Sequence, residues 1–576
     1  MAEDIYEPLS EYRDVFSPRF KDVAEKTFAE LAEEARVDVE ANRETCRQIY
    51  SEEAKLESLE SSISGWKFLR GLLWFAIAVG IIILIFNGGQ MERNQAIALA
   101  GGIFCTFVII LMVIFPKLES KGQEHDSLSA KIEELKSIAW GQMEPLNRLY
   151  DWDVFTHMMT RTVPKLEFDP YFTTQRLADL KNTYGWDGSF NAGRSVIYSH
   201  SGLINGNPFV ICRTKKMEMG TKTYTGSKTI SWTTQERGAD GKCYTAYHSE
   251  TLTAQVTAPY PNYYEKTRLI YGNTSAPDLV FTRSKSNLAG AEGTHSYRKT
   301  RRQLRKKANN LLEADYAMMT NEEFEVAFDT RDRNNNQQFA LLFTPLAQEN
   351  MLNLLKDRIV GYGDDFDFNK DRMINTIIPD HLQSLNLDMN PDQFRDFDYD
   401  KAEKAFHEIN AKYFRAIYFS LAPLLCVPIY QQIRPIEAIY GRDMQKQSSF
   451  WEHESLANFW GVDKFKHPSC VTDCILKTEQ SKGRNGKTTI KVSALGYRAV
   501  KRVTNVGVWG GDGKYHQVPV YWDEYLSVTG TGNISIKEDE NFEDLELTQH
   551  ERLDHISTVL TTSDLSVYRR HIASKV

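Results

Sequence analysis

Cysteine is scarce in this sequence, and its placement excludes a fold stapled by disulfides. The chain has 576 residues and seven cysteines, at Cys46, Cys105, Cys212, Cys243, Cys426, Cys470 and Cys474. An odd, scattered set in a long chain is typical of reduced thiols. The stretch before the first hydrophobic run is polar and charged, so we also expect no secretory signal.

Patterns of the common catalytic and cofactor sites are missing as well. The glycine cluster Gly507 to Lys514 has the wrong spacing for a phosphate loop, and Tyr515 stands where a Ser or Thr hydroxyl would bind magnesium. No G-x-S-x-G nucleophile elbow and no H-E-x-x-H helix occur. We therefore expect no cofactor, and the sequence leans against an enzyme.

The acidic run Asp364 to Asp371 lacks the residues of a calcium loop. Counting from Asp365, the sixth position is Lys370 rather than Gly and the twelfth is Thr376 rather than Glu. We predict a solvated acidic loop instead.

An excess of positive charge is also lacking. The formal net charge is -8, so composition gives no argument for nucleic acid, and we expect none as a partner. Hydrophobic residues make up 41% and aromatic residues 12% of the chain, which is enough to build a core and excludes general disorder. This length predicts roughly two or three domains besides any anchor.

Two long uncharged runs are present. Gly71 to Phe86 carries no charge and would span roughly 24 Å as a helix, and Phe68 and Leu69 extend it. Ala96 to Pro116 is about 21 residues long, enough to cross a bilayer. We predict a transmembrane hairpin with spans of about 68–86 and 96–116. The alternative is a buried helical hairpin of a soluble core.

Basic residues beside the spans predict that both termini lie in the cytoplasm. The connecting loop holds Arg93 alone, whereas the flanks hold Lys55, Lys67, Arg70, Lys117, Lys121 and Lys131. Cytoplasmic flanks of membrane spans are enriched in Lys and Arg. The sequence therefore predicts a multi-pass membrane protein with a cytoplasmic body.

The flanks of the spans have helical periodicity. Phe20 to Ser64 reads as one long helix with a coiled-coil seam that has one polar break. The seam residues are Phe28, Ala35, Asn42, Ile49, Leu56 and Ile63, and the stripe after the second span is Leu128, Ile132, Leu135 and Ile138. We expect both membrane helices to continue and pack antiparallel as a stalk. Alternatively the seam is a homo-oligomer interface.

Two regions change from helical to alternating periodicity. They run from about Gly188 to Lys285 and from Cys470 to about Lys537, with hairpin turns expected at Asp240-Gly241, Asn485-Gly486 and Gly510 to Gly513. The predicted fold is α+β, with a transmembrane helical hairpin and coiled-coil-like stalk before an antiparallel-sheet-rich body. The expected segments are a helical stalk at 1–65, the hairpin at 66–116, a returning stalk helix at 117–165, a β-rich domain at 166–315, an α/β core at 316–465, and a second β-rich block with a C-terminal helix at 466–576.

A basic run from Tyr297 to Lys307 is a candidate lipid-binding site. Its cations are Arg298, Lys299, Arg301, Arg302, Arg305, Lys306 and Lys307. Such a cluster close to a bilayer attracts anionic headgroups. Few aromatic residues interleave with the cations, which disfavours nucleic acid. The plainer interpretation is the solvated face of a surface helix.

One cluster has residue types that bind metals. His453, His467, Cys470 and Cys474 could offer imidazole and thiolate ligands to zinc. However, C-x3-C is not the usual zinc-knuckle spacing. If residues 470–474 form a strand, the two thiols lie about 13 Å apart, too far for one ion. Ordinary core thiols are the alternative.

A third apolar stretch, Ala416 to Tyr430, is too short for a span. It is about 15 residues long and contains Pro423 and Pro428. We expect a buried segment of the soluble core. A re-entrant or interfacial piece and a third span are the alternatives.

The segment Glu323 to Lys356 (EFEVAFDTRDRNNNQQFALLFTPLAQENMLNLLK) resembles the signature of a bacterial family of two-transmembrane-helix proteins that carry a domain of unknown function. In that family, Glu-Phe begins a short strand that ends in Phe and an acidic turn, and an apolar helix then leads to Leu-Thr-Pro and a second helix. The matching residues are Glu323, Phe324, Phe328, Asp329, Leu342, Thr344, Pro345, Met351 and Leu354. The chain departs from the pattern at Asn334 to Asn336 and at Gln338-Phe339.

The resemblance implies a bacterial cell membrane and a LemA-type membrane protein as a partner, and it supplies no catalytic residues. From the residues themselves, Thr344 suits an N-cap and Pro345 the first helical position. We expect Phe324, Phe328, Leu341 and Leu342 in the core.

These observations favour a membrane-anchored cytoplasmic scaffold or protein-interaction protein. One alternative is a membrane-associated enzyme that uses the His/Cys cluster. Another is an accessory subunit of a transport complex. Thr106 is the polar residue within the uncharged spans, which argues against a pore formed by this chain alone.

Overall fold

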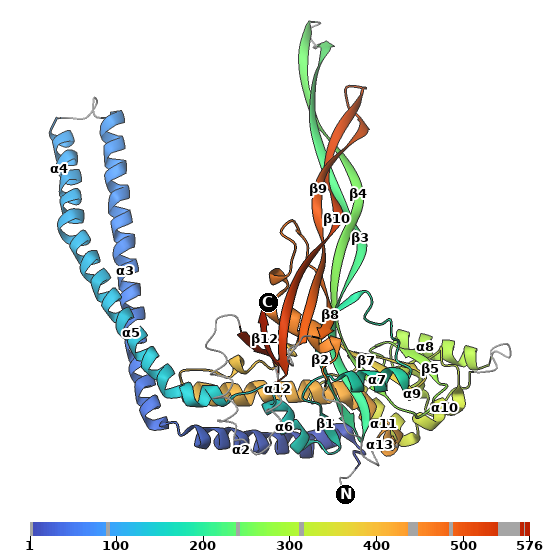
Figure 1. The fold of residues 1–576 in the computed structure, drawn as a ribbon. Coiled ribbons are helices and arrows are strands. Elements are labelled where there is room, and N and C mark those ends of the chain that lie inside the picture. Colours follow the sequence, from blue (N-terminus) through green and yellow to red (C-terminus); the bar gives the residue numbers. More distant parts are fainter. Residues whose placement is uncertain are drawn as a thin grey trace. The chain divides into compact units, whose positions relative to one another are not determined.

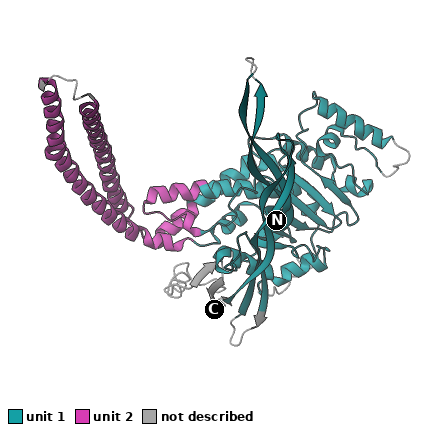
Figure 2. Ribbon diagram, turned by 90° about the horizontal axis from the view of Figure 1, so that it is seen from above, with its two compact units in different colours: residues 1–25, 151–390, 409–576 teal, residues 26–150, 391–408 magenta. Residues whose placement is uncertain are grey.

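The structure, a computed structural model, describes residues 4–87, 93–237, 242–309, 316–435, 447–482, 488–538, 565–568 and 571–575. The chain forms two compact units (Figure 2). Unit 1 comprises residues 1–25, 151–390 and 409–576, and unit 2 comprises residues 26–150 and 391–408. Residues 391–408, which the sequence analysis placed in the segment 316–465, group with the helices of unit 2.

Unit 2 is built on long antiparallel helices (Figure 1). Their bounds are α3 Val39–Asn87, α4 Arg93–Ile109 and α5 Phe115–Leu149, with a π-helical turn at Ile110–Ile114 between the last two. Ion pairs join α3 to α5, between Glu52 and Lys131 at 2.9 Å and between Glu60 and His125 at 3.3 Å. The later residue of α3, Glu60, pairs with the earlier residue of α5, His125. The two helices therefore run antiparallel, as predicted for the stalk.

The two predicted spans lie in helices that are long and apolar enough to cross a membrane. These helices cover Val39–Phe86 and Asn94–Leu149, and only 11% of the most apolar window of each is buried. Phe75 is 70% exposed and Phe104 is 67% exposed. A helix from the core of a soluble protein would bury such side chains. The described residues therefore do not support a buried soluble hairpin.

The helix expected from Phe20 to Ser64 is broken, so that prediction was wrong in its continuity. α2 (Ser17–Ala35) ends before Arg36, which has a φ of 50°. The next helix, α3, starts beyond Asp38, whose carboxylate accepts a hydrogen bond from the N–H of Ala41 at 3.0 Å. A helix-capping aspartate and a left-handed residue together end one helix and start another.

The seam of the stalk is filled, in part, by residues 391–408 of the same unit. The ring of Phe28 packs on those of Tyr399 and Phe406, with centroids 5.5 and 5.4 Å away. Asn42, the polar break, donates to the carbonyl of Phe397 at 2.8 Å and accepts from the N–H of Tyr399 at 3.0 Å. The break therefore satisfies backbone groups that would otherwise be buried without a partner.

Unit 1 contains a seven-stranded antiparallel sheet with the order β1-β2-β3-β4-β7-β6-β5. The strands are β1 Leu166–Phe168, β2 Arg194–Ile204, β3 Asn207–Arg237, β4 Cys243–Gly272, β5 Val280–Arg283, β6 Phe366–Asp371 and β7 Ile374–Pro379. The β-rich region predicted from Gly188 to Lys285 is confirmed. The turn expected at Asp240-Gly241 lies outside the described residues.

The acidic run was expected to be a solvated loop, and this prediction was wrong. Residues 366–371 form strand β6, which pairs with both β5 and β7. Asp364 and Lys370 are buried, with relative exposures of 6% and 1%. Alternating Phe366 and Phe368 face the core and draw the polar residues between them into the sheet.

Helices pack near β5 to β7 and hold the segment with the family resemblance. They are α8 His295–Ala308, α9 Glu322–Phe328, α10 Asn336–Leu342 and α11 Pro345–Lys356. The strand that the resemblance implied is helix α9. The cap prediction is confirmed, because the hydroxyl of Thr344 accepts from the N–H of Ala347 at 3.4 Å. Phe324, Phe328 and Leu342 are core residues as expected, but Leu341 is 51% exposed.

The third apolar stretch is a buried core segment, as predicted. It spans the end of α12 (Tyr399–Leu425) and the start of α13 (Pro428–Gln432). Tyr418, Leu421 and Tyr430 are at most 1% exposed. Phe414, just before the stretch, stacks on Phe20 with ring centroids 4.1 Å apart.

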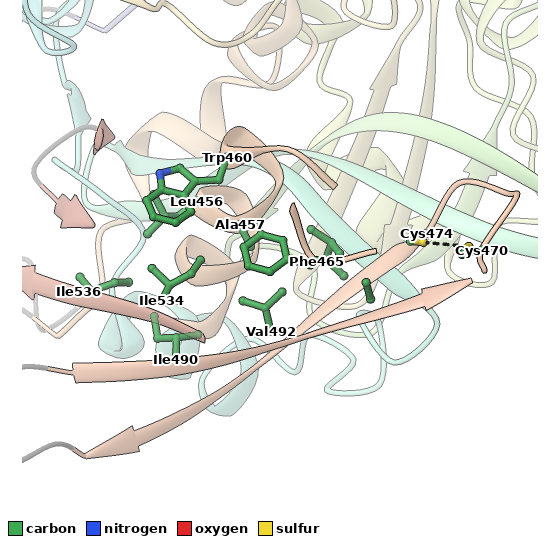
Figure 3. Packing of buried hydrophobic residues seen from close by; sticks show 12 residues of the cluster. Leu456, Ala457, Trp460, Phe465, Cys470, Cys474, Ile490, Val492, Ile534 and Ile536 are labelled. Carbon is green, nitrogen blue, oxygen red and sulfur yellow. Dashed lines mark hydrogen bonds between the residues drawn. The ribbon is translucent and has the colours of Figure 1, made fainter. Parts of the chain in front are cut away.

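A second sheet has five strands in the order β11-β12-β10-β9-β8. Its strands are β8 Ile475–Lys482, β9 Thr488–Trp509, β10 Tyr515–Glu538, β11 Leu565–Tyr568 and β12 His571–Lys575. Helix α15 (Phe450–Trp460) packs on this sheet through Leu456 and Trp460 (Figure 3). Residues 483–487, with the predicted Asn485-Gly486 turn, and residues 539–564 lie outside the described part. Residues 565–568 and 571–575 form strands, and the described residues do not test the helix expected near the C-terminus.

Candidate interaction surfaces

Two long hairpins of unit 1 lie side by side and form a two-layered arm (Figure 1). Strand β3 pairs with β4 from Phe209 to Arg237, and β9 pairs with β10 from Thr488 to Trp509. Strand β2 accompanies β3 only as far as Lys216. We define the arm as residues 217–237, 243–262, 496–509 and 515–533. Its two hairpins leave the sheets and depend on each other for a core.

A cluster of inward-facing residues holds the two hairpins of the arm together. The buried cluster consists of Ile230, Leu252, Ala254, Val518 and Val520. A Cβ on Gly226 would overlap the backbone of β10, so glycine allows the layers to approach closely. The N–H of Gly511 also donates to Glu250 at 2.6 Å. These contacts fix the face that each hairpin turns outward.

The outward face of the β3–β4 hairpin is an uncharged ladder of hydroxyl and amide side chains. Its residues are Thr221, Thr223, Thr225, Ser227, Thr229, Ser231, Thr233 and Gln235 on β3, and Thr245, Tyr247, Ser249, Thr251, Thr253, Gln255, Thr257 and Pro259 on β4. Each of them is exposed. Thr223 and Thr257 are hydrogen-bonded across the strands at 3.2 Å, as are Thr229 and Thr251. We call this surface the hydroxyl face.

The outward face of the β9–β10 hairpin carries four exposed aromatic or apolar side chains among polar ones such as Lys501, Asn505 and Gln517. Val503, Trp509, Tyr515 and Tyr521 are 54%, 67%, 58% and 69% exposed. Trp509 lies opposite Tyr515, and their rings meet edge to face with centroids 5.6 Å apart. A Cβ on Gly507 would overlap the ring of Tyr515, so this glycine gives the ring its place. We call these four residues the aromatic strip. Exposed aromatic groups of this kind mark protein interaction sites.

The sequence contained the signal for the hydroxyl face, although the sequence analysis identified only strands. Threonine and serine recur at every second position from Thr221 to Thr233. That spacing places them on one face of a strand. The packing of one hairpin on the other could not be predicted, because it joins residues far apart in the chain.

The predicted lipid site is helix α8, and its cations divide into two groups. Arg301 and Arg305 form ion pairs with Glu322, at 2.9 and 2.5 Å. Lys307 donates to the carbonyl of Arg331 at 2.7 Å. These three residues therefore help to fasten α8 to its own unit.

The other cations of α8 are Arg298, Lys299, Arg302 and Lys306, and all four are exposed. At about 100° per residue they share one sector of the helix with Arg305. Tyr297 and Leu304 face the core from the opposite side. The structure thus reduces the predicted lipid-binding site to these four exposed cations, which we call the cationic face of α8.

The four predicted metal ligands do not meet. His453 is buried in α15, and its Nε2 lies 3.0 Å from the hydroxyl of Ser448. His467 accepts hydrogen bonds from Ser469. Within the described ranges, no group of three or more His, Cys, Asp or Glu side chains could hold a metal ion. The structure brings together only Cys470 and Cys474, whose sulfur atoms are 3.6 Å apart (Figure 3).

The separation of about 13 Å, given for the case that residues 470–474 form a strand, therefore does not apply. Strand β8 begins at Ile475, and the residues before it bend. The bend is held by a hydrogen bond from the N–H of Cys470 to the carbonyl of His467 at 2.8 Å.

A hollow of about 350 Å³, including its open mouth, lies in unit 1 beside Tyr198, His200 and Tyr413. Nε2 of His200 is 3.1 Å from the carbonyl oxygen of Asp169, so it must donate there. Nδ1 then accepts from the hydroxyl of Tyr198 at 3.1 Å. Both nitrogens are engaged, and this histidine is not poised as a general base.

No protein-family model, curated protein or solved structure matches the chain.

Proposed function

We propose that this chain is a membrane-anchored scaffold that binds a protein partner through its arm. The observation that carries the proposal is the aromatic strip on the two-layered arm. Tyr521 and Trp509 are large, exposed rings, and their strands are fixed from behind by a buried cluster. Rigid aromatic side chains contribute contact area at low conformational cost and dominate many interfaces.

The proposed anchor is the pair of apolar helices α3 and α4–α5. Most of their apolar surface is exposed, because only 11% of the most apolar 18-residue stretch of each helix is buried. Lipid would cover that surface. Lys67 and Arg70 lie at the start of the first span and Lys117 follows the second, which supports a cytoplasmic location for the body and both termini.

The partner-binding part is tested by replacing Trp509, Tyr515 and Tyr521 with Ala in one full-length variant. The proteins that co-purify in mild detergent are then compared with those of the wild type. The matched control replaces Thr223, Thr229 and Thr251, on the hydroxyl face, with Ala. We expect at least one stoichiometric partner to be lost from the aromatic variant and kept by the control. Identical sets of partners would overturn the proposal, provided that both variants keep the wild-type circular dichroism.

The anchor and its sidedness can be tested with a native cysteine. Cys243 is an exposed residue at the start of β4. In intact cells a membrane-impermeant maleimide should not label it, and labelling should appear after permeabilisation. A Cys243→Ser variant gives the background. Labelling of intact cells would contradict the sidedness, and protein in the supernatant after alkaline extraction would contradict the anchor.

Two further assignments belong to this proposal. A LemA-type membrane protein, implied by the family resemblance, is a specific candidate for the co-purifying partner, and a bacterial cell membrane is the proposed location. The cationic face of α8 would bind anionic headgroups of the same bilayer. The enzyme alternative has less support, because the described residues do not bring its histidines to its cysteines.

A further inference from the structure

Cys470 and Cys474 lie in the bend before β8, at the edge of a buried cluster of the second sheet (Figure 3). Their sulfur atoms are 3.6 Å apart, whereas a disulfide requires about 2.05 Å. The thiols are therefore close enough to bond after a small shift. The sequence analysis did not reveal this, because it considered a strand, in which residues four positions apart lie about 13 Å from each other.

The bend that holds the thiols is fastened on several sides. The N–H of Val471 donates to the carbonyl of Tyr497 at 2.9 Å, and the N–H of Tyr497 donates to the hydroxyl of Thr472 at 3.0 Å. Asp473 forms an ion pair with Lys215 at 2.6 Å. These contacts fix Cys470 and Cys474 from β9 and β3. The proximity of the two sulfurs thus follows from a constrained bend.

Gly496 provides the space for both sulfurs. A Cβ at this position would lie 2.5 Å from Sγ of Cys470 and 2.7 Å from Sγ of Cys474. A side chain at position 496 of β9 would push the two thiols away. Gly496 therefore leaves room beside β9 for both sulfur atoms.

The two thiols are not equivalent. Burial raises the pKa of Cys470, but hydrogen bonds from Thr472, Cys474 and Tyr497 outweigh it, so the pKa is lowered overall. Burial raises the pKa of Cys474 to about 12, and its hydrogen bond with Cys470 adds to the rise. Cys470 is 8% exposed and Cys474 only 1%. Cys470 is thus the more accessible thiol and the better thiolate.

We propose that Cys470 and Cys474 form an oxidisable dithiol, at which hydroperoxides convert this chain reversibly to an intramolecular disulfide. The thiolate of Cys470 attacks one oxygen of the peroxide, the O–O bond breaks, and a sulfenic acid and hydroxide result. Cys474 then gives up its proton, attacks the sulfenic sulfur and expels water. Overall, two thiols and one H₂O₂ give one disulfide and two waters. A reduced dithiol that closes only on oxidation is typical of redox-sensing sites in reducing compartments.

The purified full-length protein in detergent provides a direct test. It is treated with hydrogen peroxide, blocked with N-ethylmaleimide under denaturing conditions and digested with trypsin. Cleavage after Lys466 and Lys477 releases one peptide, His467 to Lys477, that contains both cysteines. We expect this peptide to lose two hydrogens and to carry no maleimide. Dithiothreitol should restore two maleimide labels.

Two variants separate the chemistry from a general effect on folding. Cys474→Ala should stop at the sulfenic acid of Cys470, which dimedone traps. Thr472→Val should keep both thiols but slow closure by roughly ten-fold, because it removes the hydroxyl that hydrogen-bonds Cys470 and also accepts from the N–H of Tyr497 in the bend. Cys243, an exposed thiol of the same chain, is the internal reference.

Two outcomes would overturn the proposal. One is a peptide that carries two maleimides after peroxide has oxidised Cys243. The other is dimedone adducts that accumulate at Cys470 in the wild type as readily as in Cys474→Ala. The wild-type peptide assay needs no substitution, so a variant that fails to fold does not affect it.

Discussion

Arg283 and Asp364 form an ion pair in which both side chains are buried. Their side chains are 0% and 1% exposed. The guanidinium also donates to the carbonyl of Phe366 at 2.5 Å, and the carboxylate accepts from the N–H groups of Ser286 and Asn287 at 2.9 and 2.8 Å. The pair thus joins β5, β6 and the loop before α8. Each charge is compensated only as long as the other is present.

Replacing Asp364 with Ala should leave Arg283 as an uncompensated buried charge. We expect a loss of about 3–5 kcal/mol in the free energy of unfolding. The measurement is denaturant-induced unfolding of the detergent-purified protein. Asp380→Ala is the control, because the pair of Asp380 with Lys285 has side chains that are 49% and 47% exposed, and such pairs contribute about 1 kcal/mol or less. Equal losses in both variants would show that the Arg283–Asp364 pair is not specifically important.

Truncating a side chain in the core of the arm should destabilise the arm without destabilising the rest of unit 1. Leu252 is 3% exposed and belongs to the cluster between the hairpins, so Leu252→Ala should cost about 2–5 kcal/mol locally. Hydrogen exchange should accelerate in residues 217–237 and 515–533 but not around Phe172 and Ile270, in another cluster. Thr251→Ala, its neighbour on the hydroxyl face, is the control and should leave exchange unchanged. Uniform acceleration over the whole chain would contradict a separate arm core.

His453 should make the protein sensitive to acid. Burial lowers the pKa of this imidazole from 6.5 to about 4. Between those values the unfolded chain holds a proton that the folded chain does not, so stability falls as the pH falls from 6.5 towards 4. The full effect is about 3 kcal/mol.

The measurement for His453 is the free energy of unfolding as a function of pH. His453→Gln should reduce the slope of this curve between pH 6.5 and pH 4 by the equivalent of one proton. An unchanged slope in His453→Gln would refute the assignment to this residue.

Helix α8 should respond to anionic lipid. In nanodiscs that contain phosphatidylserine, we expect slower hydrogen exchange in residues 298–307 than in purely zwitterionic nanodiscs, because exposed cations would bind the headgroups. Replacing Arg298, Lys299, Arg302 and Lys306 with Glu should abolish the difference. Gln303→Glu, on the same helix, tests whether one negative charge suffices. The same exchange rates in both lipids would leave α8 as a solvated surface helix.

Several features could be predicted because the signal for each is local. The charge-free runs that include Phe75 and Phe104 indicated spans, and alternation indicated the strands from Gly188 onwards. Thr344-Pro345 indicated a helix start that the structure confirms. In each case the pattern repeats within a few residues, and the physics of burial or capping acts over the same distance.

Other features failed because their partners are distant in the sequence. Asp364 reads as part of a solvated loop until Arg283, from a strand 81 positions away, binds it. The helix break at Arg36 depends on one backbone conformation that the heptad pattern does not show. The thiols of Cys470 and Cys474 meet because contacts from β9 and β3 bend the chain between them.

The sequence by itself determined which stretches avoid water and with what period, and hence the two apolar helices, the strand regions and the buried stretch from Ala416 to Tyr430. Only the tertiary structure decided which charges are paired in the core, which hairpin face carries the aromatic strip and which cysteines touch. The physical reason is that burial preference belongs to a residue and its near neighbours, whereas a contact between side chains exists only once the chain has folded back on itself.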